Sequence, residues 1–207
     1  MRIGIFGGSF NPIHNGHIAL GDSMLGAMSL DEVWYMVSPR NPLKRLSMEL
    51  ADEDVRLRWV EMALEGHPAL MPSDYEFRLP RPSYTWNTLQ QLRKDRPADE
   101  FVLIIGGDNI SKFTKWANYR DILDGYAIAV YPRKGEDLPE WVGQVQNVTV
   151  TDMPLMDVSS TMIRAKVSRG EDISPYVPAA IKEQVEEYYV RLFAEAHRAE
   201  AVIVHSS

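Results

Sequence analysis

Short apolar runs alternate along the chain with stretches in which apolar residues recur at helical spacing. The runs typical of buried strands are 3–6, 30–38, 101–105 and 126–131, with two weaker β segments near 69–77 and 147–151. Stretches that predict helices are 18–28, 52–65, 84–94 and 179–199, and a shorter helix is expected to open at 159 or 160. Such alternation is typical of βαβ units. The pattern predicts an α/β fold, a doubly wound parallel sheet with helices on both faces and closing C-terminal helices.

The composition is that of one ordinary globular domain. Of 207 residues, 45% are hydrophobic and 25% charged, so we expect a single domain over 1–200 and a frayed tail over 201–207. The net charge of −7 argues against a general nucleic-acid or membrane partner. Without cysteine, no disulfide, thiolate metal site or cysteine nucleophile is available. The absence of a signal sequence and of a membrane-spanning run predicts a cytoplasmic protein.

A glycine-rich turn carries the strongest chemical signal. The segment GGSFNPIHNGH, residues 7–17, lies between the first predicted strand and the first predicted helix. Gly7 and Gly8 let a ligand approach the backbone closely, and an Asn-Pro pair forces the turn. The unpaired N–H groups expected at the helix start form an anion site, toward which His14 and His17 can both point. This arrangement suits a phosphate-bearing ligand.

Two other interpretations of His14 and His17 stay open at this point. The pair could ligate a metal, although only three other histidines and no cysteine are present to supply a third strong ligand. The two side chains could also be solvated residues beside a structural turn. A Walker loop and a dinucleotide fingerprint do not apply, because neither GxxxxGK[ST] nor GxGxxG occurs in this segment.

Further polar groups follow other predicted strands, at the sheet edge where doubly wound folds bind ligands. They are the basic loop 39–46, the helix start at 83–85, the GGDN segment 106–109 and the basic turn 132–135. Each also has a structural interpretation, as a solvated loop or a helix cap, and a nearby tryptophan is equally consistent with core packing. In VSSTMIR, residues 158–164, two serines and an arginine converge at a helix start, which suits a polyphosphate.

Together these motifs resemble the bacterial nicotinate-nucleotide adenylyltransferases, in the nucleotidyltransferase superfamily that carries the (H/T)xGH motif. The resemblance covers nearly the whole chain. It rests on GGSFNPIHNGH at 7–17, PSYTWNTL at 82–89, IIGGDN and the tryptophan at 104–116, YPRKG at 131–135, VSSTMIR at 158–164 and YVP at 176–178. The resemblance implies a Rossmann-like doubly wound fold and adenylyl transfer.

The resemblance also implies roles for individual residues. ATP would be bound by Gly7, Gly8, Ser9, Phe10, His14, Gly16, His17, Gly106, Asp108, Ser159, Ser160 and Arg164. The pyridine nucleotide would be bound by Lys44, Tyr84, Thr85, Trp116 and Arg133, with backbone N–H groups at 84–85 holding the carboxylate and Trp116 stacking on the ring. His14, His17, Lys44 and Arg164 would be catalytic, and the protein would supply no metal ligand of its own.

The implied reaction joins ATP and nicotinate mononucleotide into deamido-NAD and pyrophosphate, in the synthesis of NAD. A phosphomonoester oxygen is already ionised near neutral pH, so direct in-line attack needs no general base and no covalent intermediate. Alignment and charge stabilisation are what the reaction requires. Mg²⁺ would be held mainly by phosphates and water. The expected partners are these small molecules, and a homo-oligomer is compatible with the sequence.

Two positions depart from the family pattern. Asn87 stands where the family often has Asp, which leaves the role of that carboxylate open, and Asn41 to Lys44 lacks the usual Pro-Pro, which makes the alignment of Lys44 uncertain by one residue. Rival functions are the same chemistry on nicotinamide mononucleotide or phosphopantetheine, a nucleotide-binding regulator without turnover, and a tRNA synthetase fragment. The last is disfavoured because no KMSKS-like segment is present.

Overall fold

The computed structural model describes residues 1–39, 49–132, 137–152 and 157–204. Its strands are β1 (Arg2–Gly8), β2 (Glu32–Val37), β3 (Leu70–Ser73), β4 (Glu100–Gly106), β5 (Ala127–Tyr131) and β6 (Val148–Val150). They form one parallel sheet in the order β3-β2-β1-β4-β5-β6. This is the strand order of a doubly wound dinucleotide-binding sheet, so the predicted fold class is confirmed.

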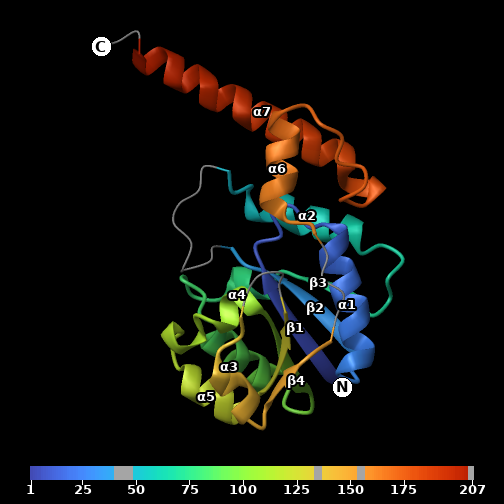
Figure 1. The fold of residues 1–207 in the computed structure, drawn as a ribbon, viewed down its shortest axis with the longest axis vertical. Helices are drawn as coiled ribbons and strands as arrows, with labels where there is room; N and C mark the ends of the chain where they lie inside the picture. Colours follow the sequence, from blue (N-terminus) through green and yellow to red (C-terminus); the bar gives the residue numbers. More distant parts are fainter. Residues whose placement is uncertain (40–48, 133–136, 153–156, 205–207) are drawn as a thin grey trace.

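The helices cover both faces of the sheet (Figure 1). One hydrophobic cluster joins the sheet to α1 (Asn15–Ala27), α2 (Glu53–Ala63), α6 (Ser160–Ser168) and α7 (Ala179–Val204). The other joins it to α3 (Thr85–Asp95), α4 (Gly107–Ile110), the 3-10 helix η2 (Phe113–Lys115), α5 (Tyr119–Gly125) and the 3-10 helix η3 (Glu140–Gln144). None of the described helices is both long and apolar enough to span a membrane.

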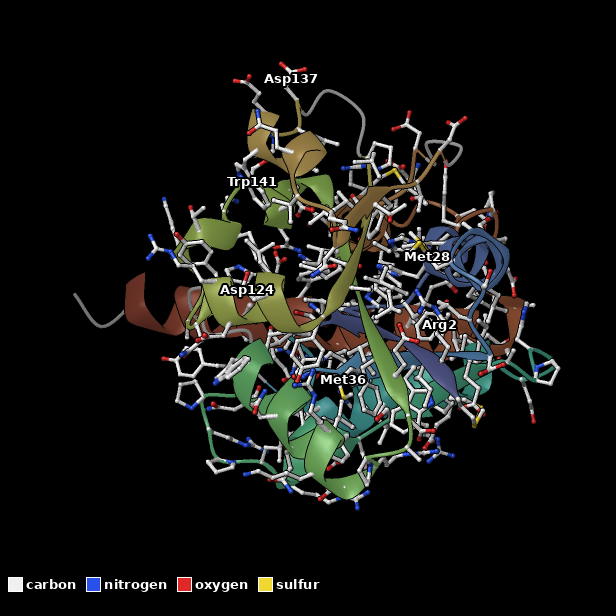
Figure 2. The ribbon with its side chains drawn as sticks, turned by 90° about the horizontal axis from the view of Figure 1, so that it is seen from below. Arg2, Met28, Met36, Asp124, Asp137 and Trp141 are labelled. Atoms are coloured by element: carbon white, nitrogen blue, oxygen red, sulfur yellow. The ribbon has the colours of Figure 1, made fainter. Side chains whose placement is uncertain are left out.

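The apolar runs of the central strands follow from burial on both sides. In β4, Val102 and Ile104 belong to the first cluster, whereas Leu103 and Ile105 belong to the second. A strand covered on both faces must be apolar at every position, because successive side chains point to opposite sides. Figure 2 shows side chains filling the space between the layers, with Met36 inside and Asp137 at the outer edge.

Two segments differ from the sequence prediction. The strand expected over 69–77 ends at Ser73, and the chain turns into the 3-10 helix η1 (Tyr75–Arg78), which directs the side chain of Glu76 inward. Three hydroxyl groups contributed by other elements hold that side chain, and no local pattern could indicate them. The closing helix continues to Val204, beyond the predicted end at 199.

The strand order places two glycine-rich strand ends side by side. β1 pairs with both β2 and β4, and Phe6 lies opposite Ile104 in the register with β4. Consequently Gly7 and Gly8 at the end of β1 lie next to Gly106 at the end of β4. The connections on the two sides of this strand pair run in opposite directions, which is where doubly wound sheets open a crevice for a ligand.

Candidate active site

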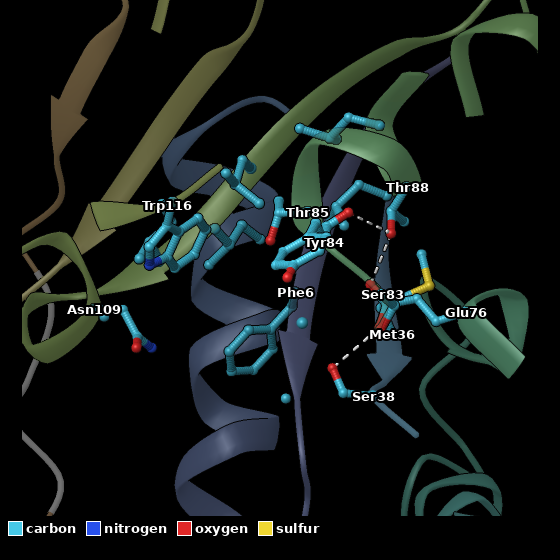
Figure 3. Close-up of a pocket in the computed structure, with 18 of the residues that line it drawn as sticks. Phe6, Met36, Ser38, Glu76, Ser83, Tyr84, Thr85, Thr88, Asn109 and Trp116 are labelled. Atoms are coloured by element: carbon cyan, nitrogen blue, oxygen red, sulfur yellow. Dashed lines mark hydrogen bonds between the residues drawn. The ribbon is translucent and has the colours of Figure 1, made fainter. Parts of the chain in front are cut away.

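A cavity of about 140 Å³ lies at this crevice. Its floor is formed by the ends of β1 and β4, one wall by the start of α3, and the opposite wall by the turn after α4 (Figure 3). The predicted residues that line it are Gly7, Gly8, Tyr84, Thr85, Gly106 and Trp116. The structure therefore brings together residues that are up to about a hundred positions apart in the sequence.

The two histidines form a reciprocal cap at the start of α1. The backbone N–H of His17 donates to Nδ1 of His14 at 3.3 Å, and the backbone N–H of His14 donates to Nδ1 of His17 at 3.2 Å. The N–H of Asn15 donates to the carbonyl of Tyr176. The expected unpaired N–H groups at this helix start are therefore only partly present: those of Asn15 and His17 have partners, whereas that of Gly16 has none among the described residues.

This arrangement determines what the two rings offer to a ligand. A ring nitrogen that accepts a hydrogen bond carries no hydrogen, so the neutral forms of His14 and His17 carry theirs on Nε2. The rings stack with centroids 3.6 Å apart and an interplanar angle of 20°. Their orientation is thus fixed from the backbone side, and an Nε2–H group is a donor of the kind that phosphate oxygens accept.

Packing beneath the histidines involves two residues predicted to bind ATP. The ring of Phe10 is 3% exposed and meets the ring of His17 edge-on at 5.1 Å, under Gly8. The side chain of Phe10 is therefore a support for His17 and does not line the ligand space. At Gly16 an added Cβ would lie 2.7 Å from Val158, so this glycine is needed for the close approach of the segment that precedes α6.

That second segment is fixed directly to the glycine-rich turn. Ser159 caps α6 by accepting from the N–H of Met162, as expected, and Ser160 Oγ donates to the carbonyl of Pro12 at 2.8 Å across 148 positions. Arg164 donates to the carbonyl of Asn11 at 2.9 Å and forms an ion pair with Glu49 at 3.0 Å. The predicted convergence of hydroxyls and guanidinium thus occurs beside the histidines.

The start of α3 lacks the side-chain helix cap that was one interpretation of residues 83–85. Its N-cap residue is Tyr84, which makes no side-chain capping bond, and the N–H groups of residues 85–87 have no hydrogen bond among the described residues. The hydroxyls of Ser83 and Thr88 donate to Glu76 instead. Of residues 85–87, Thr85 lines the cavity, so the start of this eleven-residue helix borders the cavity and offers it the donors of an anion site.

Trp116 lies on the wall opposite the start of α3 (Figure 3). Its ring packs against Phe113 with centroids 5.1 Å apart, while its Nε1 is buried and has no hydrogen-bond partner in the described part of the chain. A buried donor without a partner is costly unless a ligand supplies an acceptor. Asp108, in the first turn of α4, packs its carboxylate against Gly106.

Two predicted site residues lie outside the described residues, and several residues that line the cavity were not predicted from the sequence. Lys44 and Arg133, predicted to contact phosphates, lie outside the described residues. The cavity is also lined by residues that the sequence did not single out, namely Ser38, Glu76, Asn109 and Lys115. Asn109 belongs to the GGDN motif and could have been found from it. Ser38 and Glu76 acquire their position only through contacts distant in sequence.

Comparison with known proteins agrees with this geometry. Residues 5–166 match the cytidylyltransferase-like family model. The chain is 43% identical over 185 residues to a Bacteroides fragilis protein and 41% identical over 188 residues to one from Flavobacterium johnsoniae, both named "Probable nicotinate-nucleotide adenylyltransferase". The alignments cover 89% and 90% of this chain and 90% and 96% of the relatives.

A solved structure supports the fold independently. The Plasmodium falciparum nicotinic acid mononucleotide adenylyltransferase superposes with a TM-score of 0.74 at 17% identity, covering 92% of this chain and 95% of that one. Fold, motif order and sequence identity agree over most of the length. The chain therefore belongs to the nicotinate-nucleotide adenylyltransferase family, a family of nucleotidyltransferase enzymes that act in NAD biosynthesis.

Proposed function

We propose that this site transfers AMP from ATP to nicotinate mononucleotide, giving deamido-NAD and pyrophosphate. The observation that carries the proposal is the open start of α3 opposite Trp116 in one cavity. Three N–H groups without partners suit a carboxylate, and an indole across the cavity suits a flat ring. The P. falciparum enzyme, whose fold this chain shares, was solved in complexes with NaAD and with APC.

The reaction follows from what the residues can do. A phosphate oxygen of nicotinate mononucleotide attacks the α-phosphorus of ATP, a new P–O bond forms, and the bond to pyrophosphate breaks on the opposite side. The attacking oxygen is ionised near neutral pH, so no residue has to remove a proton. The proposal assigns the stabilisation of charge on the phosphates to His14, His17, Ser159, Ser160 and Arg164, and it is supported by the contact of Ser160 and Arg164 with the glycine-rich turn.

Magnesium would accompany ATP as the phosphates' own counter-ion. Among the described residues, no group of three His, Asp or Glu side chains is arranged to hold a metal. The histidine end of the site offers mostly imidazoles, hydroxyls and a guanidinium, whereas Mg²⁺ prefers oxygen ligands in octahedral geometry. Its ligands would therefore be phosphate oxygens and water, and no step is assigned to a protein-held metal.

Several further assignments belong to this proposal. Lys44 and Arg133 contact substrate phosphates, and Gly106 and Asp108 lie on the adenosine side. ATP and nicotinate mononucleotide are the partners, with Mg²⁺ as cofactor. The enzyme works in the cytoplasm as a single catalytic domain over residues 1–200. These assignments rest on the family's motifs and their order along the chain.

The test is pyrophosphate release from ATP and Mg²⁺ with nicotinate mononucleotide or nicotinamide mononucleotide at equal concentration. We expect a preference for the acid of at least 100-fold in kcat/KM, because the amide places an NH₂ group against N–H donors. Preference for the amide would contradict the assignment of the α3 pocket. Binding of both nucleotides without turnover would instead favour a regulator that has kept the fold.

A further inference from the structure

Glu76 is a buried acidic side chain for which the reaction above has no use. It is 7% exposed, lines the cavity and is surrounded by hydroxyls (Figure 3). Its Oε2 accepts from Ser38 Oγ at 3.2 Å and from Ser83 Oγ at 3.0 Å, and its Oε1 accepts from Thr88 Oγ1 at 2.9 Å. All of its hydrogen-bond partners among the described residues are neutral, and no cation within that part of the chain forms an ion pair with it.

Keeping a carboxylate ionised in such buried surroundings costs desolvation free energy. Burial is the main cause that raises the pKa of Glu76, and the three hydroxyl bonds act against it by favouring the ionised form. An apolar residue would avoid the desolvation altogether. The carboxylate has an advantage as a hydrogen-bond acceptor. Its two oxygens can accept all three hydroxyl bonds, whereas the amide of a glutamine at this position would have a single acceptor oxygen.

The three hydroxyls belong to elements that meet at the cavity. Ser38 follows β2, and its N–H donates to the carbonyl of Gly8 at 2.9 Å, which connects it to the glycine-rich turn. Ser83 directly precedes the N-cap of α3, and Thr88 lies one turn further along that helix. Glu76 therefore joins the sheet edge to the start of α3.

The exposure of the chain between Glu76 and Ser83 makes the hydrogen bond between these two residues important for the position of α3. Both of these residues are buried, whereas residues 80–82 between them are exposed. An exposed loop has few contacts of its own to define where it ends. One ion pair, between Arg81 and Glu53 at 2.5 Å, holds this loop to α2, and the position of the first N–H groups of α3 relative to the sheet depends on the bonds that Glu76 makes at the end of the loop.

We propose that Glu76 is a positioning residue that holds the open start of α3 at the distance from the sheet and Trp116 that a nicotinate carboxylate and ring require. The proposal rests on the proposed function, because it takes nicotinate mononucleotide as the ligand of this pocket. Glu76 acts through Ser83 and Thr88 and has no direct contact with the reacting phosphates. It should therefore affect the binding of one substrate and leave the other unaffected.

Steady-state kinetics of Glu76→Ala and Glu76→Gln test the proposal. For Glu76→Ala we expect KM for nicotinate mononucleotide to rise at least tenfold, while KM for ATP and kcat at saturation stay within twofold. The preference for acid over amide should fall by a similar factor. Glu76→Gln keeps the shape and one acceptor oxygen, so its effect should be intermediate.

Asp95→Asn is the matched control. Asp95 also accepts from a neighbouring hydroxyl and an amide, namely Tyr75 at 2.6 Å and Gln91 at 2.8 Å, but it lies at the far end of α3 and does not line the cavity. This variant should leave both KM values and the acid preference unchanged. If Glu76→Ala does not fold, Ser83→Ala removes one of the three bonds and should raise the same KM by a smaller factor.

Two outcomes would overturn the role of Glu76. One is a variant that unfolds at lower temperature but keeps the wild-type KM for nicotinate mononucleotide, and the other is an equal rise in both KM values. These failures are distinct from failure of the proposed function. In that case the wild-type protein itself would not transfer AMP to nicotinate mononucleotide, whatever the variants did.

Discussion

Two helix starts lie at the carboxyl end of the parallel sheet, and they are built in opposite ways. At α1 the rings of His14 and His17 accept from backbone N–H groups through Nδ1, so the neutral rings carry their hydrogen on Nε2. At α3 no side chain caps the helix, and the N–H groups of residues 85–87 are open. In the proposed function both starts supply hydrogen-bond donors to an anion, the first through side chains and the second through the backbone.

The difference matches the chemistry proposed for each end. Phosphate groups change charge and geometry during transfer, and imidazoles on fixed rings are preorganised donors for the position where that charge develops. A carboxylate that remains unchanged needs only a rigid, shape-specific site, which backbone N–H groups provide. We infer that α1 contributes mainly to the rate and α3 mainly to the choice of substrate. Three further experiments separate these contributions.

The largest effect is expected at the capped start. His14→Asn replaces the N-cap residue with another good N-cap but removes the Nε2–H donor, so kcat should fall about 10²–10³-fold. Stability should change little. His14→Ala should lose a comparable factor in kcat and also about 1 kcal/mol of stability, because the cap is lost as well. Denaturant unfolding and initial rates measure both quantities, and full activity of His14→Asn would contradict a catalytic role.

A smaller effect is expected at the open start. Proline is well accepted at the first position of a helix, where it removes an N–H group that the helix does not use. Thr85→Pro should therefore keep α3 but lose one donor to the carboxylate, which raises KM for nicotinate mononucleotide about tenfold or more. Thr85→Ala, which keeps the N–H, is the control for the side chain. Equal KM values for the two variants would show that this N–H does not bind the substrate.

The smallest effect is expected at α6, where a hydroxyl closes the helix start. Ser159→Ala removes the bond to the N–H of Met162 and should cost about 1 kcal/mol of unfolding free energy. KM for ATP should rise by less than tenfold, because Arg164 and Ser160 remain. Ser159→Thr, which keeps a capping hydroxyl, should recover the stability. Ser168→Ala, at the other end of α6, should change neither quantity.

The sequence alone was sufficient for the fold class and for the segments that carry chemistry. Apolar runs and helical spacing are local properties, so they located five of the six strands closely and every helix of nine or more residues, but not the shorter α5. The glycine-rich turn and the VSSTMIR segment were also recognisable locally. The relation between them required the structure, because Ser160 reaches the carbonyl of Pro12 only after the chain has folded back over 148 positions.

What only the tertiary structure decided is how each group is used. The sequence shows two histidines at a helix start, but their reciprocal caps follow from ring orientations that packing on Phe10 and Phe6 supports. It shows a serine and a threonine near the start of α3, but their hydroxyls turn to Glu76, so this helix start remains open. Hydrogen bonds over long sequence distances compete with local ones, and only the packed fold determines which are made.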